Sequence, residues 1–249
     1  MIILKISKNH SMVKLMRKNY SFKKIYLICS GKGGVGKSTT TYNLALNLAA
    51  QGLKAAIFDA DVYNSSIPLM MNINHRHLET ANPEILIPPS KHGVKVMSAG
   101  FMIPDNMPVI WRGQTLFGML NRMIEDTYWG DNDILLIDLP PGTGEIPVYI
   151  SQLLPIDGCI IITTPDELAF QGSFKAANLF DSLDIPVYGI IENMTDEYYT
   201  VFGKTRQKEL VDYFGNAFWG SVPLLPDINS GGTQHFTKIT ENLLEPTLV

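Results

Sequence analysis

Residues 30–39 read SGKGGVGKST, and this stretch decides the fold. It matches the pattern G-x-x-x-x-G-K-[ST] of a phosphate-binding loop, and it lies between an apolar run at residues 25–29 and a helix-like segment at residues 39–50. Glycines let backbone N–H groups converge on phosphate oxygens, because a side chain would block the approach. A helix that begins near Lys37 adds the positive end of its dipole. The sequence therefore predicts a nucleotide phosphate site between a strand and a helix.

Individual residues of this loop have separate expected roles. We expect Lys37 to contact the β- and γ-phosphates of ATP and the Ser38 hydroxyl to ligate Mg²⁺. The alternative interpretation is a glycine-rich turn without a ligand, which the full match in register disfavours. The predicted ATP-binding residues of the loop are Gly31, Lys32, Gly33, Gly34, Val35, Gly36, Lys37, Ser38 and Thr39.

Short apolar runs alternate with helix-like segments along the rest of the chain. Continuous apolar runs indicate strands that are buried on both faces, and strand–helix alternation is typical of an α/β fold with a doubly wound, mostly parallel sheet. We expect one domain over residues 25–249 and a surface loop at residues 82–89. The expected strands are 25–29, 55–58, 94–98, 134–137, 159–163, 187–191 and 217–222, and the expected helices are 39–50, 117–124 and 176–183.

Composition excludes several classes of protein. Hydrophobic residues make up 45% of the 249 residues and charged residues 18%, which excludes a disordered chain or a coiled coil. Apolar runs are shorter than the roughly 18 residues of a membrane helix, so we expect no membrane partner. The two cysteines, Cys29 and Cys159, are far apart in sequence, which excludes a disulfide framework and a local CxxC site. A reducing, cytoplasmic setting is expected.

Charge is distributed unevenly. No acidic residue precedes Asp59, whereas ten Lys or Arg do, and the remaining chain contains 24 acidic and ten basic residues. This excess of acid disfavours a nucleic-acid partner. Residues 1–24 are interpreted as a basic N-terminal tail, or as sequence before a true start at Met12. A targeting presequence or a surface-binding helix is the alternative.

Carboxylates follow two of the predicted strands. Asp59 and Asp61 follow the run 55–58, at the strand edge where α/β sheets bind ligands, and one of them could orient an attacking water or hold a metal-bound water. Asp138 ends the run 134–137, as in a Walker B strand, and is expected to hold Mg²⁺ through water. Gly142 is the candidate for an N–H contact to the γ-phosphate that changes on hydrolysis.

Asn193 follows the predicted strand 187–191. Its amide offers a donor and an acceptor, which suits the edge of an adenine base, and it completes the predicted ATP-binding residues. Asparagines at strand ends are also common turn formers, so this interpretation has an alternative.

A second lysine, Lys32, lies inside the loop, where an ordinary phosphate loop does not require one. The string resembles the deviant Walker A loop of the MinD, ParA, nitrogenase iron protein and Mrp class. In that class this lysine reaches across a dimer to the partner's nucleotide, so the resemblance implies an ATP-dependent homodimer; a merely solvated lysine is the alternative. The resemblance further implies that Asp61 positions water and that Asp59 supports the metal. The predicted catalytic residues are Lys32, Lys37 and Asp61, and the predicted metal residues are Ser38, Asp59 and Asp138.

Further motifs narrow the resemblance. They are DADVYNSSIP at 59–68, WRG at 111–113, DLPPGTGE at 138–145, TTP at 163–165 and ENM at 192–194. In this order they resemble the Mrp/ApbC family, also called Nbp/Ind-type P-loop ATPases, from about residue 25 to about residue 226. Members of that family are thought to carry iron–sulfur clusters to target proteins. MinD and ParA proteins share the first loop but generally lack the DLPPGTG and WRG segments.

One departure from this family concerns cluster binding. Family members usually place a CxxC pair shortly after the ENM segment, where two subunits ligate a bridging cluster. Here residues 194–203 read MTDEYYTVFG, without a cysteine. Thiolates are the usual ligands of iron–sulfur clusters, so a bound cluster is doubtful.

The resemblance thus implies a slow, Mg²⁺-dependent ATPase that dimerises and acts in iron–sulfur cluster assembly or transfer, with iron–sulfur client or assembly proteins as partners. A metal-free ATPase switch that binds a protein partner is the alternative, and a MinD- or ParA-like positioning ATPase is a more distant one.

Overall fold

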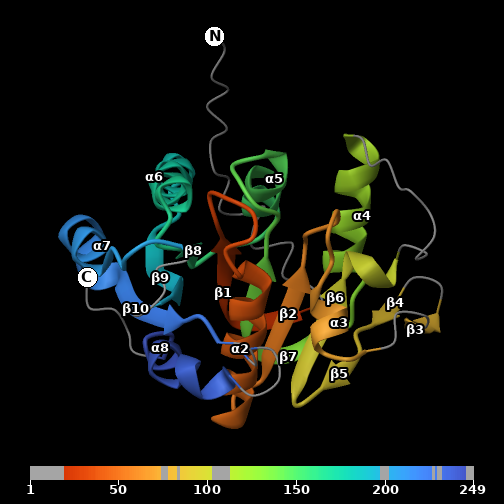
Figure 1. Ribbon diagram of the computed structural model, residues 1–249. Helices are drawn as coiled ribbons and strands as arrows, with labels where there is room; N and C mark the ends of the chain where they lie inside the picture. The colour runs from red at the N-terminus through yellow and green to blue at the C-terminus, as the bar shows by residue number, and fades with distance from the viewer. Residues whose placement is uncertain are drawn as a thin grey trace.

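The computed structural model describes residues 20–73, 78–82, 85–102, 113–196, 202–225, 228 and 232–244. Its central sheet has eight strands in the order β10-β9-β8-β1-β7-β2-β6-β5 (Figure 1). Every neighbouring pair is parallel except β5 and β6, so the predicted mostly parallel sheet is confirmed. The strands are β1 (Tyr20–Cys29), β2 (Ala55–Asp59), β5 (Ser90–Lys91), β6 (Val94–Ser98), β7 (Gly130–Asp138), β8 (Gly158–Thr163), β9 (Val187–Thr195) and β10 (Phe218–Pro223).

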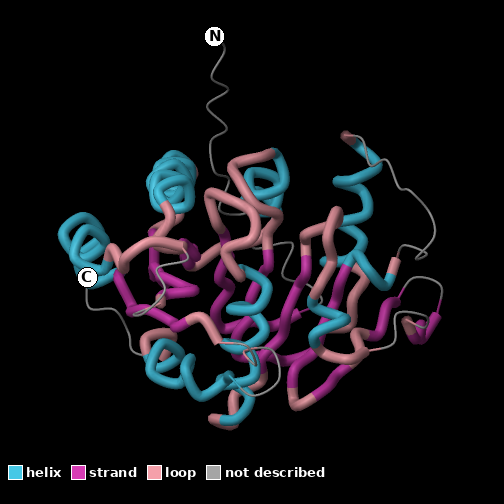
Figure 2. The backbone as a smooth tube through the Cα atoms, viewed as in Figure 1, coloured by secondary structure: helices cyan, strands magenta, loops and turns pink. Residues whose placement is uncertain are grey.

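Helices cover both faces of this sheet, as a doubly wound fold requires (Figures 1 and 2). One face carries α4 (Gln114–Glu125), α5 (Glu145–Leu153), α6 (Glu167–Ser182) and α7 (Gln207–Phe214). The other face carries α2 (Lys37–Ala50), α3 (Ile67–Met70) and α8 (Thr237–Glu241). Short 3-10 helices lie at η2 (Ala99–Phe101), η3 (Gly215–Ala217) and η4 (Gly232–Phe236).

Two apolar cores lie on the two faces of the sheet. Alternate residues of a strand point to opposite faces, and in β1 Leu27 packs toward α4–α7 whereas Ile28 packs toward α2, α3 and α8. Phe180 of α6 fills the first core and Leu44 of α2 the second. Because the central strands are apolar on both faces, their sequences form continuous runs.

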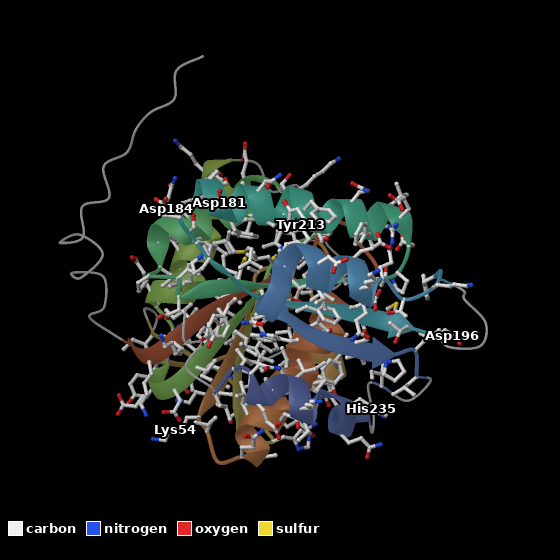
Figure 3. All side chains as sticks on the ribbon, turned by 90° about the vertical axis from the view of Figure 1, so that its left-hand side faces the viewer. Lys54, Asp181, Asp184, Asp196, Tyr213 and His235 are labelled. Atoms are coloured by element: carbon white, nitrogen blue, oxygen red, sulfur yellow. The ribbon has the colours of Figure 1, made fainter. Side chains whose placement is uncertain are left out.

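Helices α6 and α7 pack through aromatic rings. Phe174 of α6 contacts Tyr213 of α7 edge-on at a centroid distance of 4.5 Å, and Figure 3 shows Tyr213 beside α6, on the opposite side of the sheet from His235. Among the residues that the structure describes, no helix is both long and apolar enough to cross a membrane.

Two sequence-based boundaries differ from the structure. Strand β1 begins at Tyr20, which pairs with Gly130, so the last five residues of the predicted tail belong to the sheet. Residues 1–19 lie outside the described part. The segment 82–89 is not only a loop, because β3 (Glu79–Asn82) pairs with β4 (Ile85–Ile87) and Leu86 is buried. Backbone hydrogen bonds to Asp126 and Tyr128 hold Leu86 in place, and single-sequence patterning does not predict such a contact.

Candidate nucleotide-binding site

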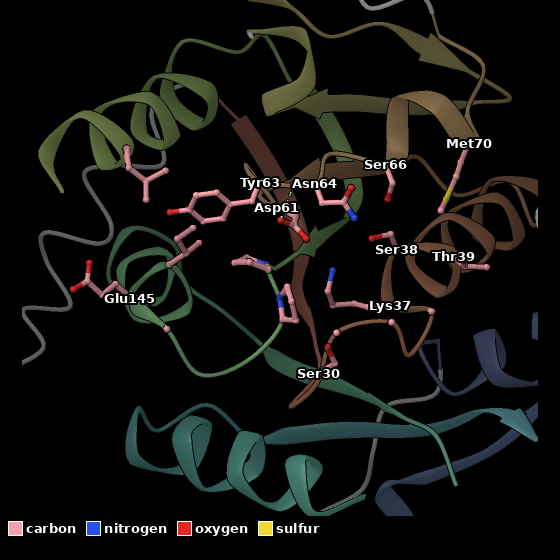
Figure 4. Close-up of a pocket in the computed structure, with 18 residues that line it drawn as sticks. Ser30, Lys37, Ser38, Thr39, Asp61, Tyr63, Asn64, Ser66, Met70 and Glu145 are labelled. Atoms are coloured by element: carbon pink, nitrogen blue, oxygen red, sulfur yellow. Dashed lines mark hydrogen bonds between the residues drawn. The ribbon is translucent and has the colours of Figure 1, made fainter. Parts of the chain in front are cut away.

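The candidate site lies where β1, β2 and β7 end side by side. Asp59 of β2 is the register partner of Asp138 of β7, which in turn pairs with Ile28 of β1. A cleft of about 700 Å³ opens at this edge of the sheet, and Figure 4 shows Lys37, Ser38 and Asp61 directed into it. The lining comprises Ser30, Gly33, Gly34, Gly36, Lys37, Ser38, Thr39, Asp61, Tyr63, Asn64, Ser66, Met70, Leu116, Pro140, Pro141, Gly144, Glu145 and Ile146.

The loop between β1 and α2 turns directly into the helix at Gly36. Gly36 has φ +80°, a left-handed conformation that suits glycine, and its carbonyl accepts the first helical bond from the Thr40 N–H at 2.9 Å. Helix α2 therefore begins at Lys37 with its N-terminus toward the cleft, which favours an anion there. The helix ends at Ala50, the last residue of the helix predicted over residues 39–50.

Asp138 receives three hydrogen bonds at the end of β7. The Lys37 ammonium donates to its Oδ1 at 2.7 Å, and the Ser38 hydroxyl donates to its Oδ2 at 2.5 Å. The Thr41 hydroxyl, one helical turn beyond Lys37, also donates to Oδ1 at 3.1 Å. Asp138 is 0% exposed, so this set of donors compensates a fully buried carboxylate. The structure thus brings Lys37 and Ser38 of the loop motif together with Asp138 of the predicted Walker B strand.

Asp59 is the last residue of β2 and Asp61 lies two residues beyond it, and the two carboxylates have different surroundings. Asp59 is buried and accepts hydrogen bonds from the Ser98 hydroxyl at 2.8 Å and the Asp61 N–H at 3.2 Å. Burial, and then the neighbouring Asp138, raise the pKa of Asp59 well above its usual value. Asp61 lines the cleft and accepts the Asn64 N–H at 3.2 Å, and burial raises its pKa as well. Asp61 is therefore the carboxylate of this pair that faces the cleft.

Lys32 points away from the cleft in this chain. Its ammonium lies 2.9 Å from Oδ1 of Asp166, the residue that caps α6 by accepting the Ala169 N–H. Partial burial acts to raise the pKa of Asp166, but hydrogen bonds from Thr164 and Lys32 outweigh it, so this pKa lies below its usual value. The Lys32 side chain is 41% exposed, so it is accessible from solvent.

Gly142 and Asn193 have partners inside the chain. The Gly142 N–H donates to the Ser30 carbonyl at 2.8 Å, so a contact with a γ-phosphate requires this bond to break. The Asn193 amide donates to the Val35 carbonyl at 2.9 Å. In this structure both residues hold the phosphate loop, and their predicted ATP contacts stay predictions.

Gly31 contacts helix α6 backbone to backbone. A Cβ built on Gly31 would lie 2.1 Å from the carbonyl oxygen of Gly172, and one on Gly172 would lie 3.0 Å from the Gly31 backbone. The first of these distances is too short for any side chain. The start of the phosphate loop therefore depends on two facing glycines, one of which lies 141 residues further along the chain.

Replacing Gly31 with alanine is expected to push α6 away from the loop and to lower the free energy of unfolding by about 1–3 kcal/mol, or roughly 2–12 °C in Tm for a chain of this size. Gly118→Ala is the matched control, because Gly118 lies in α4 with open space around it. That control is expected to gain up to about 1 kcal/mol from helix propensity. Thermal unfolding of both variants measures the difference, and equal Tm values for the two would contradict the contact.

The two cysteines lie together in the core. Cys29 of β1 donates to the Ile160 carbonyl of β8 at 3.4 Å, and both thiols are free and buried. Burial, and then the neighbouring Cys159 thiol, raise the pKa of Cys29 well above its usual value. Thiolates are the form that ligates iron, so the raised pKa disfavours Cys29 as a cluster ligand, and complete burial disfavours Cys159.

Sequence patterns missed several residues around the site. Thr41 shares a helix face with Lys37 and could be found from the spacing of four, and Ser98 ends β6 as Asp59 ends β2. Nothing in the sequence around Lys32 or around Asp166 indicates that these two residues form an ion pair. Trp111, Arg112 and residues 197–201 lie outside the described residues. Within the described part, no group of three His, Cys, Asp or Glu side chains is arranged to hold a metal ion.

Comparison with known proteins shows the family. A family model described as ParA, NUBPL iron-transfer P-loop NTPase, matches residues 21–244. The chain belongs to this family. The predicted resemblance to Mrp-type P-loop NTPases is thereby confirmed, and the family is one of nucleotide hydrolases.

Relatives of this P-loop NTPase are named for iron–sulfur clusters. An iron–sulfur cluster carrier protein from Aquifex aeolicus is 38% identical over 214 residues, which cover 83% of this chain and 59% of the relative. An iron–sulfur cluster transfer protein NUBPL from Dictyostelium discoideum is 37% identical, over 81% of this chain and 65% of the relative. The chain therefore spans about three fifths of the length of these two relatives.

Solved structures of similar fold include a relative from the same class of nucleotide-binding proteins. A nucleotide-binding protein from Archaeoglobus fulgidus, in complex with ADP, has a TM-score of 0.71 and 31% identity, covering 94% of this chain and 93% of that one. A chain of the MinC:MinD cell division protein complex from Aquifex aeolicus has a TM-score of 0.65 and 18% identity, covering 91% of this chain and 98% of that one, and supports the fold alone.

Proposed function

We propose that this P-loop NTPase is a Mg²⁺-dependent ATPase that hydrolyses ATP slowly as a homodimer and acts in the assembly or transfer of iron–sulfur clusters. The observation that carries the ATPase is the convergence of Lys37, Ser38 and Thr41 on buried Asp138, where Lys37 and Ser38 also line the cleft. The Archaeoglobus relative in complex with ADP supports a nucleotide in this cleft. The carrier and transfer proteins among its relatives support the role with iron–sulfur clusters.

The residues of the chain suggest how ATP is bound and cleaved. The phosphates lie against the backbone of the loop and the N-terminus of α2. The Lys37 side chain leaves Asp138, and its ammonium then contacts the β- and γ-phosphate oxygens. Asp61 accepts a hydrogen bond from the attacking water and orients it toward the γ-phosphorus. Lys32 of the partner subunit stabilises the charge that develops on the phosphate in the transition state.

A divalent cation suits the oxygen donors at this site. The Ser38 hydroxyl already touches Asp138, and hard cations such as Mg²⁺ prefer hydroxyl, carboxylate and water ligands. Ser38 would ligate the ion directly, and Asp138 and Asp59 would accept hydrogen bonds from water molecules bound to it. When bound, the ion neutralises charge on the phosphates.

The loop at Gly142 couples the presence of a γ-phosphate to formation of the dimer. Its N–H donates to the Ser30 carbonyl here, and a γ-phosphate offers it a charged acceptor instead. Gain and loss of that contact would move residues 140–145 between two positions, as switch loops do. Dimer formation with ATP and loosening after hydrolysis follow from this exchange.

In this proposal the protein binds an iron–sulfur cluster and passes it on, and an experiment can identify the residues that ligate the cluster. We expect anaerobic incubation of the purified protein with iron and sulfide to give a brown protein that hydrolyses ATP and passes the cluster to an apo-ferredoxin. Absorption spectra and iron per dimer would measure binding, with Cys29→Ser and Cys159→Ser alongside. Colour that survives in both variants assigns the ligands to other residues of the chain.

A metal-free switch that binds a protein partner is the second candidate function. The burial of both thiols favours it, because neither sulfur is accessible to an iron ion. A colourless protein with unchanged ATP hydrolysis in the same experiment would support this candidate and reject cluster carriage. Free thiols also fit the cytoplasmic setting that we expect for either function.

A further inference from the structure

The last residue of β6 contacts the carboxylate that ends β2. Ser98 and Asp59 are register partners in this pair of parallel strands, and both residues are 0% exposed. The Ser98 hydroxyl donates to Oδ2 of Asp59 at 2.8 Å, and the hydroxyl oxygen accepts the Gly100 N–H at 3.1 Å. A hydroxyl has a single proton, and here that proton is directed at the carboxylate.

The other oxygen of Asp59 holds the turn that follows β2. Oδ1 of Asp59 accepts the Asp61 N–H at 3.2 Å. Within the same turn, the Ser65 hydroxyl donates to the Asp61 carbonyl at 2.9 Å. The Ala60 N–H donates to the Asp138 carbonyl at 2.9 Å. Asp59 therefore links the end of β6 to the backbone of Asp61, whose carboxylate is directed into the cleft (Figure 4).

The Ser98 hydroxyl sets the plane of the Asp59 carboxylate. The torsion angle that turns a carboxylate about its last carbon–carbon bond is broad, so donors in fixed positions determine where its two oxygens lie. The bond from the Asp61 N–H is at the long end of the usual range of N–H···O distances. Rotation of the carboxylate after loss of the Ser98 donor would therefore weaken this bond and loosen the turn.

We propose that Ser98 is a positioning residue for ATP hydrolysis, which acts through Asp59 on the place of the Asp61 carboxylate. A displacement of about 1 Å in a reacting geometry can lower a rate about a hundredfold, so the water that Asp61 orients is sensitive to this turn. Strands β7 and β2 lie between β6 and β1, from which the phosphate loop starts, so the affinity for the phosphates is separate. The inference rests on the proposed function and names a residue that supports its chemical step.

Rate and affinity together test this role. In Ser98→Ala we expect kcat to fall about tenfold, the effect of one lost hydrogen bond, while the Kd of Mg²⁺-ATP stays within about twofold. Ser98→Thr keeps the hydroxyl, suits the extended backbone at φ −140°, and should retain the wild-type kcat. Thr127→Val is the matched control, because it also removes a buried hydroxyl, which donates to the Met123 carbonyl just before β7 begins.

Hydrogen exchange of the ligand-free protein measures the turn directly. We expect the backbone amides of residues 59–66 to exchange faster in Ser98→Ala than in the wild type and to be unchanged in Thr127→Val. Ser98→Cys keeps nearly the volume of the side chain and has only a weak S–H donor, so it should behave as Ser98→Ala does. This variant separates the lost hydrogen bond from the small cavity that alanine leaves. Thermal unfolding identifies which variants are folded before they are compared.

The other outcomes reject the proposal. A wild-type kcat in Ser98→Ala and Ser98→Cys would show that hydrolysis does not depend on the hydroxyl. A loss of affinity as large as the loss of rate would indicate a general effect on the shape of the site, and a higher Mg²⁺ requirement would indicate an effect on the ion. Slower hydrolysis with unchanged exchange at residues 59–66 would exclude the route through Asp61.

Failure of the proposed function gives a different result. A wild-type protein that does not hydrolyse ATP, or full hydrolysis by Asp61→Ala, would remove the assigned chemistry and the inference with it. In the other case, Asp61→Ala is slow while Ser98→Ala is as fast as the wild type. That result would leave the proposed function in place and overturn only the role of Ser98.

Discussion

Lys37→Met is expected to abolish ATP binding at concentrations that saturate the wild type. The ammonium is the charge that meets the β- and γ-phosphates, and removing one partner of a buried charge pair costs about 2–5 kcal/mol, which is roughly 30-fold to several thousand-fold in Kd. The same change is expected to destabilise the ligand-free protein, because Asp138 is 0% exposed and keeps only the Ser38 and Thr41 hydroxyls. Binding measured by titration calorimetry and Tm measured with and without Mg²⁺-ATP would follow both effects.

A double variant separates the loss of ATP binding from the loss of stability without ligand. In Lys37→Met with Asp138→Asn, neither buried charge is left without its partner, so we expect most of the ligand-free stability to return. ATP binding should stay absent, since the ammonium is still missing. Lys238→Met, at an exposed position of α8, is the control for removal of a lysine and should match the wild type in both measurements. Near-wild-type ATP affinity in the single variant would contradict the role of Lys37.

The fold and the centre of the site follow from local patterns. Apolar runs mark all seven predicted strands, and each of them is a strand of the central sheet. The loop motif and the strand that ends in Asp138 identify residues whose types are dictated by phosphate and metal chemistry, so their meeting follows from the parallel sheet. Gly36 can also be predicted from its residue type, because the sharp turn into α2 needs a positive φ and glycine adopts one readily.

Other parts of the site depend on contacts between distant segments. The pairing of Lys32 with Asp166 and of Asn193 with Val35 joins residues more than a hundred positions apart, and single lysines or asparagines do not reveal such partners. Gly31 resembles any loop glycine until helix α6 is placed against it. Strand β4 is short and half-exposed, so its sequence suits a loop as well as a strand.

Lys32→Ala is expected to leave ATP binding within a few-fold of the wild type and to lower the rate of ATP hydrolysis by about a thousandfold, the lower end of what a cation supplied by a partner contributes. In its own chain this lysine is bound to Asp166, outside the cleft lining, so it adds little to the binding of ATP by one subunit. Ion pairs as exposed as this one contribute at most about 1 kcal/mol, so the ammonium can leave Asp166 cheaply for a phosphate of the partner. Binding and steady-state hydrolysis, measured on Lys32→Ala and on the exposed control Lys175→Ala in α6, would separate these effects.

Mixing two inactive variants tests whether Lys32 acts across the dimer. Asp61→Ala lacks the residue that orients water but keeps Lys32, and Lys32→Ala has the reverse defect. In a mixed dimer, one cleft combines the Asp61 of one subunit with the Lys32 of the other, so an equal mixture should recover about a quarter of the wild-type rate, since half of the randomly formed dimers contain one complete site. If Lys32 served its own cleft, no site in the mixture would be complete and the rate would stay at that of the separate variants. Full hydrolysis by Lys32→Ala alone would reject any catalytic role for this lysine, and with it the reason for a dimer in the mechanism.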